Sequence, residues 1–177
     1  SFEYGNYKGS SFESLLPVKI AGTGKKEGNL NVIILIDISG SVGNQYGLGT
    51  TADVAKSLAV SVMQNIAPQH SVGVLAFNDK GFVIEQLGPL EDKDMTLLQS
   101  TISSLVPSGS TNIGNGLAAA VDLLKGKAGG KNVILITDGN TQGSTDESIC
   151  YAVNNGVVVY TIGVGEDPNE MLLKKVA

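Results

Sequence analysis

Three oxygen-bearing side chains stand at alternate positions directly after an apolar run. They are Asp37, Ser39 and Ser41, and the aliphatic residues 32–36 precede them. Alternate residues of an extended segment point to the same side, so a short turn after a strand can aim these oxygens at one point. Gly40 between the serines lets the backbone approach closely. The group suits a cation, but it also fits an ordinary capped turn, because Asp and Ser are common after strands.

Two further oxygen donors follow later in the chain. Thr111 lies in the Gly- and Ser-rich piece 108–112, and Asp138 follows the apolar run 133–137. If these residues converge with the first group, two carboxylates and three hydroxyls form a site of hard oxygen ligands. That composition favours Mg²⁺, with Mn²⁺ or Ca²⁺ as alternatives, over zinc or copper. Neutral hydroxyls would leave the metal electrophilic, so it would accept one more anionic oxygen, such as a carboxylate of a partner protein.

Strands and helices alternate along the chain that must position these residues. Apolar runs predict strands over 30–36, 71–77, 133–137 and 157–164, and the turn 78–81 predicts an antiparallel strand over 82–87. Helical spacing predicts a helix that begins at Thr50 or Thr51 and ends before Pro68, and others over 95–105, 113–124, 145–154 and 168–176. Thr145 or Ser144 would cap the fourth helix. The predicted fold class is α/β, a Rossmann-like, doubly wound, mostly parallel sheet with one antiparallel edge strand and helices on both faces.

This fold explains how residues far apart in the sequence can share a site. Right-handed crossovers bring the loops that follow parallel strands to one edge of the sheet. Ligands bind there, at the point where the strand order reverses. If the strands that end before Asp37 and Asp138 flank that point, the oxygen donors converge at this edge.

The composition argues against several other classes of protein. A length of 177 residues suits one domain, and 42% hydrophobic with 16% charged residues is typical of a globular protein. The net charge is −5 and all twelve basic residues are lysines, which disfavours nucleic acid as a partner, because arginine is preferred for bidentate capture of phosphate or guanine. No apolar run approaches the roughly 20 residues that span a bilayer. The single cysteine, Cys150, is predicted to be a small buried residue of a helix.

Taken together, the motifs resemble the metal-ion-dependent adhesion site of the von Willebrand factor type A domain. That family has Asp-x-Ser-x-Ser after the first strand, a Thr in a Gly-rich loop and an Asp in a Thr-Asp-Gly turn, and this sequence has these motifs in the same order at 37–41, 109–114 and 136–139. The resemblance covers residues 30–177 and leaves 1–29 as an N-terminal extension. It implies that Ser39, Ser41 and Thr111 contact the metal directly, while Asp37 and Asp138 hold it directly or through water. A Glu or Asp carboxylate of a partner would complete the octahedron.

The resemblance implies a divalent-cation-dependent protein–protein interaction module that is not an enzyme. One alternative is a Mg²⁺-dependent hydrolase of the phosphatase type, which also has an Asp after its first strand but needs a second Asp where this sequence has Ser39. The other alternative is a structural domain of the family with an unused site. A phosphate-binding loop at 109–116 is rejected, because Asn115 and Gly116 stand where Lys and Ser or Thr are required.

The two ends of the sequence carry further expectations. Residues 15–18, Leu-Leu-Pro-Val, are similar to a short segment of prokaryotic membrane proteins that pair this domain with a glutamine-amidotransferase-like region. This likeness implies a prokaryotic source and a parent protein anchored in a membrane through parts that are not present here. Family members usually continue through a further strand and helix. The resemblance therefore implies either that these C-terminal elements are missing or that the stretch 17–20, as a short edge strand, protects the exposed sheet edge.

Overall fold

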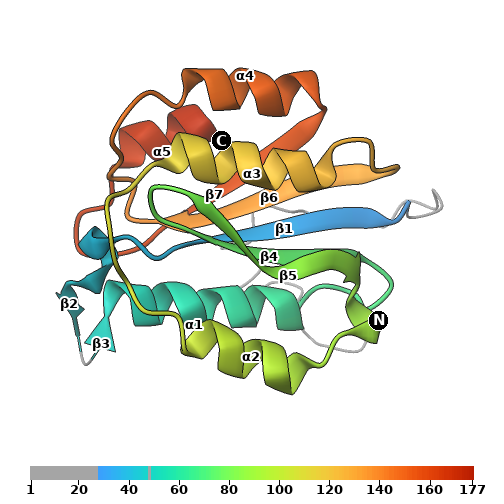
Figure 1. Ribbon diagram of the computed structural model, residues 1–177, viewed down its shortest axis with the longest axis horizontal. Helices are drawn as coiled ribbons and strands as arrows, with labels where there is room; N and C mark the ends of the chain where they lie inside the picture. The colour runs from blue at the N-terminus through green and yellow to red at the C-terminus, as the bar shows by residue number, and fades with distance from the viewer. Residues whose placement is uncertain (1–27, 48) are drawn as a thin grey trace, which may run out of the picture.

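A five-stranded sheet with the order β5-β4-β1-β6-β7 forms the middle layer of the computed structural model, which describes residues 28–47 and 49–177 (Figure 1). Four strands run parallel: β1 (Leu30–Asp37), β4 (Ser71–Phe77), β6 (Gly130–Thr137) and β7 (Val157–Gly163). The strand β5 (Gly81–Pro89) pairs antiparallel with β4 at one edge. The predicted doubly wound, mostly parallel sheet with one antiparallel edge strand is confirmed.

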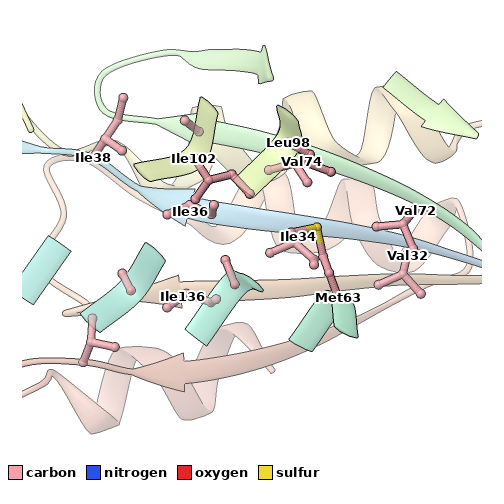
Figure 2. Close-up of a cluster of buried hydrophobic side chains, with 14 of the residues drawn as sticks. Val32, Ile34, Ile36, Ile38, Met63, Val72, Val74, Leu98, Ile102 and Ile136 are labelled. Atoms are coloured by element: carbon pink, nitrogen blue, oxygen red, sulfur yellow. The ribbon is translucent and has the colours of Figure 1, made fainter. Parts of the chain in front are cut away.

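Helices cover both faces of this sheet (Figure 1). One face carries α1 (Thr51–Gln64) and α2 (Met95–Ser103), and the other carries α3 (Ile113–Leu124), α4 (Asp146–Asn154) and α5 (Glu170–Val176). Successive side chains of β1 point to opposite faces. Ile34 and Ile36 therefore pack towards Met63 of α1 (Figure 2), whereas Ile33 packs with Leu117 of α3. Every residue of β1 after Leu30 is buried, as a central parallel strand requires.

The first helix begins where the sequence predicts. The backbone N–H of Asp53 donates to the hydroxyl of Thr50 at 3.2 Å, and the carboxylate of Asp53 accepts from the backbone N–H of Thr50 at 2.9 Å. This reciprocal pair is a capping box. The helix α2 ends at Ser103, two residues before the predicted end. The chain then turns back towards the sheet, and the N–H of Ser108 donates to the carbonyl of Ile38 at 2.8 Å.

Short regular elements connect β1 to α1. A 3₁₀ turn, η2 (Gly40–Gly43), is followed by β2 (Gln45–Tyr46) and β3 (Gly49–Thr50), which pair antiparallel. A second 3₁₀ turn, η3 (Leu90–Asp92), precedes α2. The proposed N-terminal edge strand at 17–20 lies outside the described residues.

The prediction for Cys150 was wrong, because its side chain is exposed. The helix α4 packs against α3 and β7 through its inward face, where Ser148 and Ala152 are buried and Ile149 is half-buried. Position 150 lies about 100° further round the helix than Ile149. It therefore faces solvent. In the described ranges 28–47 and 49–177, no helix is long and apolar enough to cross a membrane.

Candidate metal centre

The candidate centre lies where the strand order of the sheet reverses. From β1 the chain proceeds to β4 and β5 on one side, and then returns to β6 and β7 on the other. Asp37 is the last residue of β1, and Asp138 follows directly after β6, the neighbouring strand. This is the place where doubly wound sheets bind ligands, beyond the carboxyl ends of their strands.

Asp37 is the most deeply buried carboxylate of the site, with no exposed surface. Its Oδ1 accepts the backbone N–H of Ser39 at 2.8 Å, and its Oδ2 accepts the hydroxyl of Thr137 at 2.5 Å. Burial raises the pKa of Asp37 to about 6, because it removes water from the charged form. The hydrogen bonds from Ser39 and Thr137 oppose this rise, and the nearby charge of Asp138 adds to it.

The two serines of the first motif place their hydroxyls side by side. The Oγ atoms of Ser39 and Ser41 are 3.0 Å apart, and Ser39 is fully buried. Gly40 between them donates its N–H to the carbonyl of Gly109 at 2.9 Å. A Cβ atom at position 40 would lie 3.0 Å from that same oxygen. The glycine therefore permits a close approach to the neighbouring loop, as the sequence predicts.

Thr111 lies in a loop that is hydrogen-bonded to the loops that follow β1 and β6. On one side the carbonyl of Gly109 accepts from Gly40, and on the other the carbonyl of Thr111 accepts the N–H of Gln142 at 2.8 Å. The next residue but one, Ile113, donates its N–H to the hydroxyl of Thr141 at 3.0 Å. The loop before α3 is therefore held between the loops that follow β1 and β6. Thr111 itself is only 7% exposed.

Asp138 occupies a tight turn at the end of β6. Its Oδ1 accepts the N–H of Asn140 at 2.8 Å, and its carbonyl accepts the N–H of Asn169, ahead of α5, at 2.9 Å. Gly139 has a φ of +79°, a left-handed conformation that favours glycine. Asp138 is 7% exposed, so it is the carboxylate of the pair that reaches towards the surface.

Sequence reasoning gave no role to Thr137, although it lies within the third motif. Its hydroxyl donates to Asp37 and accepts the N–H of Gly139 at 3.0 Å. One side chain thus links the buried carboxylate to the turn that carries Asp138. A polar residue at the end of the apolar run 133–136 was the signal in the sequence, since a polar group that a strand buries needs partners.

The candidate donors are two carboxylates and three hydroxyls, and in the described part of the chain neither Asp37 nor Asp138 forms an ion pair with a lysine or histidine. Within the same ranges, no three His, Cys, Asp or Glu side chains gather where they could hold a metal ion. A centre here therefore depends on the hydroxyls of Ser39, Ser41 and Thr111 as much as on the carboxylates. Such an all-oxygen set fits a hard cation.

His70, the single histidine, lies by the amino-terminal ends of β1 and β4, away from the candidate centre. Its Nδ1 accepts the N–H of Leu30, the first residue of β1, at 3.4 Å. Asp37 is at the other end of the same strand. The imidazole therefore cannot serve as an acid, a base or a metal ligand at the candidate centre.

The sequence was compared with protein families and with individual proteins. The family model for the von Willebrand factor type A domain matches residues 31–177. The mouse collagen alpha-1(VI) chain is 29% identical over 153 residues, which cover 79% of this chain and 15% of that protein. The Xenopus laevis collagen alpha-1(XXI) chain is 28% identical over 153 residues and covers 83% and 15%, respectively. The chain thus spans about 15% of the length of these relatives.

Solved structures share the fold at low sequence identity. An aerotolerance-related membrane protein from Bacteroides fragilis superposes with a TM-score of 0.73 at 20% identity, covering 85% of this chain and 87% of that one. Proximal thread matrix protein 1 from the mussel byssus, with a zinc-occupied adhesion-site motif, gives 0.68 at 23% identity, with coverages of 84% and 41%. Manganese-loaded TRAP protein from Plasmodium vivax gives 0.68 at 20% identity, with coverages of 85% and 63%.

Proposed function

The chain belongs to the von Willebrand factor type A domain family, and from this premise we propose that it is a divalent-cation-dependent protein–protein interaction module. The cation is Mg²⁺, with Mn²⁺ or Ca²⁺ as alternatives. Its ligands, direct or through water, come from three loops: Asp37, Ser39, Ser41, Thr111 and Asp138. A Glu or Asp carboxylate of a partner protein completes the coordination.

The observation that carries this proposal is the environment of Asp37. A fully buried carboxylate without a basic partner in the described residues is costly, because burial removes its hydration. A cation next to the paired hydroxyls of Ser39 and Ser41 would supply the missing positive charge. The same hydroxyls would then act as neutral ligands.

The charges of the site favour an anionic partner group. Asp37 and Asp138 together balance one divalent ion, and the three hydroxyl ligands add no charge. The bound metal therefore keeps its attraction for a further oxygen donor, and a carboxylate binds hard cations of this kind well. Two solved relatives with the same fold, the mussel byssus protein with zinc and the Plasmodium vivax protein with manganese, support a divalent cation in general.

Recognition, and not catalysis, fits the residues available. A phosphatase-type hydrolase needs a second carboxylate where Ser39 stands. His70 lies by the amino-terminal end of β1, at the other end of that strand from Asp37. No other histidine occurs in the sequence to transfer a proton. Hydrolysis of a phosphate monoester that is lost in Asp37→Asn would instead favour the phosphatase alternative.

A metal titration tests the proposal directly. Isothermal titration with Mg²⁺ should give one site in the wild-type chain and none in Asp138→Ala, and the melting temperature of the wild type alone should rise with Mg²⁺. Glu147→Ala, which removes an exposed carboxylate from α4, serves as the control and should behave as the wild type. A wild-type chain that takes up no divalent cation would leave the structural domain with an unused site as the better description.

Capture of partner proteins is tested with the same variants. The immobilised wild-type domain should retain partner proteins in Mg²⁺ and release them in EDTA, while Asp138→Ala should retain none of them. Blocking the partner's carboxylates by amidation should prevent capture. A complex that resists EDTA would place recognition outside the metal site.

A further inference from the structure

A buried amide lies beside the loop of Thr111 without being a candidate ligand. Asn78 follows directly after β4 and is only 8% exposed. The backbone carbonyl of the preceding residue, Phe77, accepts the N–H of Ile38 at 2.8 Å, so the end of β4 lies against the loop that follows β1. A polar side chain this deeply buried needs hydrogen-bond partners.

Asn78 bonds the chain on both sides of Thr111, once through its side chain and once through its backbone. Its Nδ2 donates to the carbonyl of Ser108 at 3.0 Å. Its backbone carbonyl accepts the N–H of Asn112 at 2.7 Å. One residue therefore holds the loop three positions before Thr111 and one position after it.

The rest of Asn78 is fixed by the turn between β4 and β5. Its Oδ1 accepts the N–H of Lys80 at 3.3 Å, and its backbone N–H donates to the carbonyl of Lys80 at 3.1 Å. The side chain must donate in one direction and accept in the other, which a primary amide does and a carboxylate or an aliphatic group does not. The loop is also closely packed, since a Cβ at Gly109 would lie 3.2 Å from Nδ2.

We infer that Asn78 is a positioning residue that sets the place of the Thr111 hydroxyl at the metal centre. The inference rests on the function proposed above. Asn78 is not one of the proposed ligands, but its bonds to Ser108 and Asn112 leave the Thr111 segment little freedom. Because metal ligands must be held closely in place, a partner that orients a ligand loop contributes to affinity through that ligand.

The test is a double-mutant cycle read out by metal affinity. Free Mn²⁺, measured by electron paramagnetic resonance, gives the dissociation constant of the wild type, Asn78→Ser, Thr111→Ala and the double variant. Asn78→Ser should weaken Mn²⁺ binding about 10-fold or more in the wild-type background, as loss of partners that orient ligands does elsewhere. In the Thr111→Ala background the same change should alter the dissociation constant less than about 2-fold, because non-additivity identifies residues that act together. Equal losses in the two backgrounds would overturn the inference.

A matched control separates positioning from general support of the turn. Asn115, exposed on α3, donates its Nδ2 to the carbonyl of Asp79 at 2.8 Å, a similar bond to the same turn. Asn115→Ser should lower the melting temperature but leave Mn²⁺ affinity unchanged. Asn78→Ala, which removes both hydrogen-bonding groups of the side chain, is measured beside Asn78→Ser. A wild type that binds no metal would contradict the proposed function. Unchanged Mn²⁺ affinity in both Asn78 variants would contradict only this inference.

Discussion

The hydroxyl of Thr137 donates a 2.5 Å hydrogen bond to the carboxylate of Asp37, although the two residues are 100 positions apart in the sequence. The bond joins the ends of the neighbouring strands β1 and β6. Because Thr137 also accepts the N–H of Gly139, the orientation of the buried carboxylate is coupled to the turn that carries Asp138. Two candidate ligands from different loops therefore depend on one hydroxyl.

Thr137→Val should damage both stability and metal binding. The change keeps the shape of the side chain but leaves an oxygen of Asp37 and the N–H of Gly139 without this partner, which costs roughly 1–3 kcal/mol of unfolding free energy. Mg²⁺ affinity should fall about 10-fold, as it does when residues that orient metal ligands are lost. Urea unfolding and Mg²⁺ titration measure the two effects.

Thr161→Val is the matched control for that experiment. Thr161, on β7, donates its hydroxyl to the carbonyl of Leu173 at 3.3 Å and is half-buried, but it lies outside the candidate centre. It should lose some stability and no Mg²⁺ affinity. If Thr137→Val bound Mg²⁺ as tightly as this control, the coupling through Thr137 would have no role in metal binding.

Asp37 should make the metal-free chain less stable as the pH rises. Its pKa in the folded state is about 6, above the ordinary 3.8, so the folded chain binds the proton more tightly than the unfolded chain does. Its contribution is then fully present below pH 3.8 and is lost as the pH rises through 6. The loss amounts to at most about 3 kcal/mol, at 1.36 kcal/mol per pKa unit. Urea unfolding in EDTA at pH 5 and pH 7 measures the part of this loss that falls between these two values.

Asp37→Asn is the variant that isolates this effect. An amide carries no charge, so the metal-free variant should lose less stability between pH 5 and pH 7 than the wild type does. With Mg²⁺ the direction reverses for the wild type, because the metal competes with the proton, and affinity should fall as the pH drops below 6. Identical pH profiles for wild type and variant in EDTA would show that Asp37 is not the responsible group.

Gly40→Ala should disturb the contact between the first loop and the Thr111 loop. The new Cβ would lie 3.0 Å from the carbonyl oxygen of Gly109, a backbone atom that cannot move aside on its own. We expect a loss of roughly 1–3 kcal/mol, typical of overpacking, together with weaker Mg²⁺ binding. Gly28→Ala, where a Cβ would meet nothing within 4 Å, should leave both quantities unchanged. Wild-type Mg²⁺ affinity in Gly40→Ala would show that the close approach is not needed.

The sequence was most informative where local pattern and topology agree. Continuous apolar runs indicated buried parallel strands, and the sheet then brought Asp37 and Asp138 to neighbouring strand ends. Cys150 was misjudged because a nine-residue helix with one buried face gives no periodic signal strong enough to orient each position. The roles of Thr137 and Asn78 depend on partners 100 and 30 residues away, which no local pattern specifies. The packed structure was needed to identify them.

The start of α4 provides a contrast to Thr137. The sequence predicts Thr145 or Ser144 as the cap, and the structure divides these roles. Thr145 occupies the N-cap position without a capping bond, whereas the hydroxyl of Ser144 accepts the N–H of Asp146 at 3.1 Å. The Oγ1 of Thr145 is buried and has no hydrogen-bond partner among the described residues, and Thr145 is 2% exposed. The two hydroxyls therefore contribute to stability with opposite signs.

Thr145→Val should therefore leave the unfolding free energy unchanged or raise it by about 1 kcal/mol, because it replaces an unsatisfied buried hydroxyl with a methyl group of similar shape. Ser144→Ala should lower it by about 0.5–2 kcal/mol through loss of the bond to Asp146. Urea unfolding of both variants beside Thr137→Val ranks three hydroxyl removals in one chain. A clear loss of stability in Thr145→Val would mean that a bound water or a moving side chain satisfies that hydroxyl in solution.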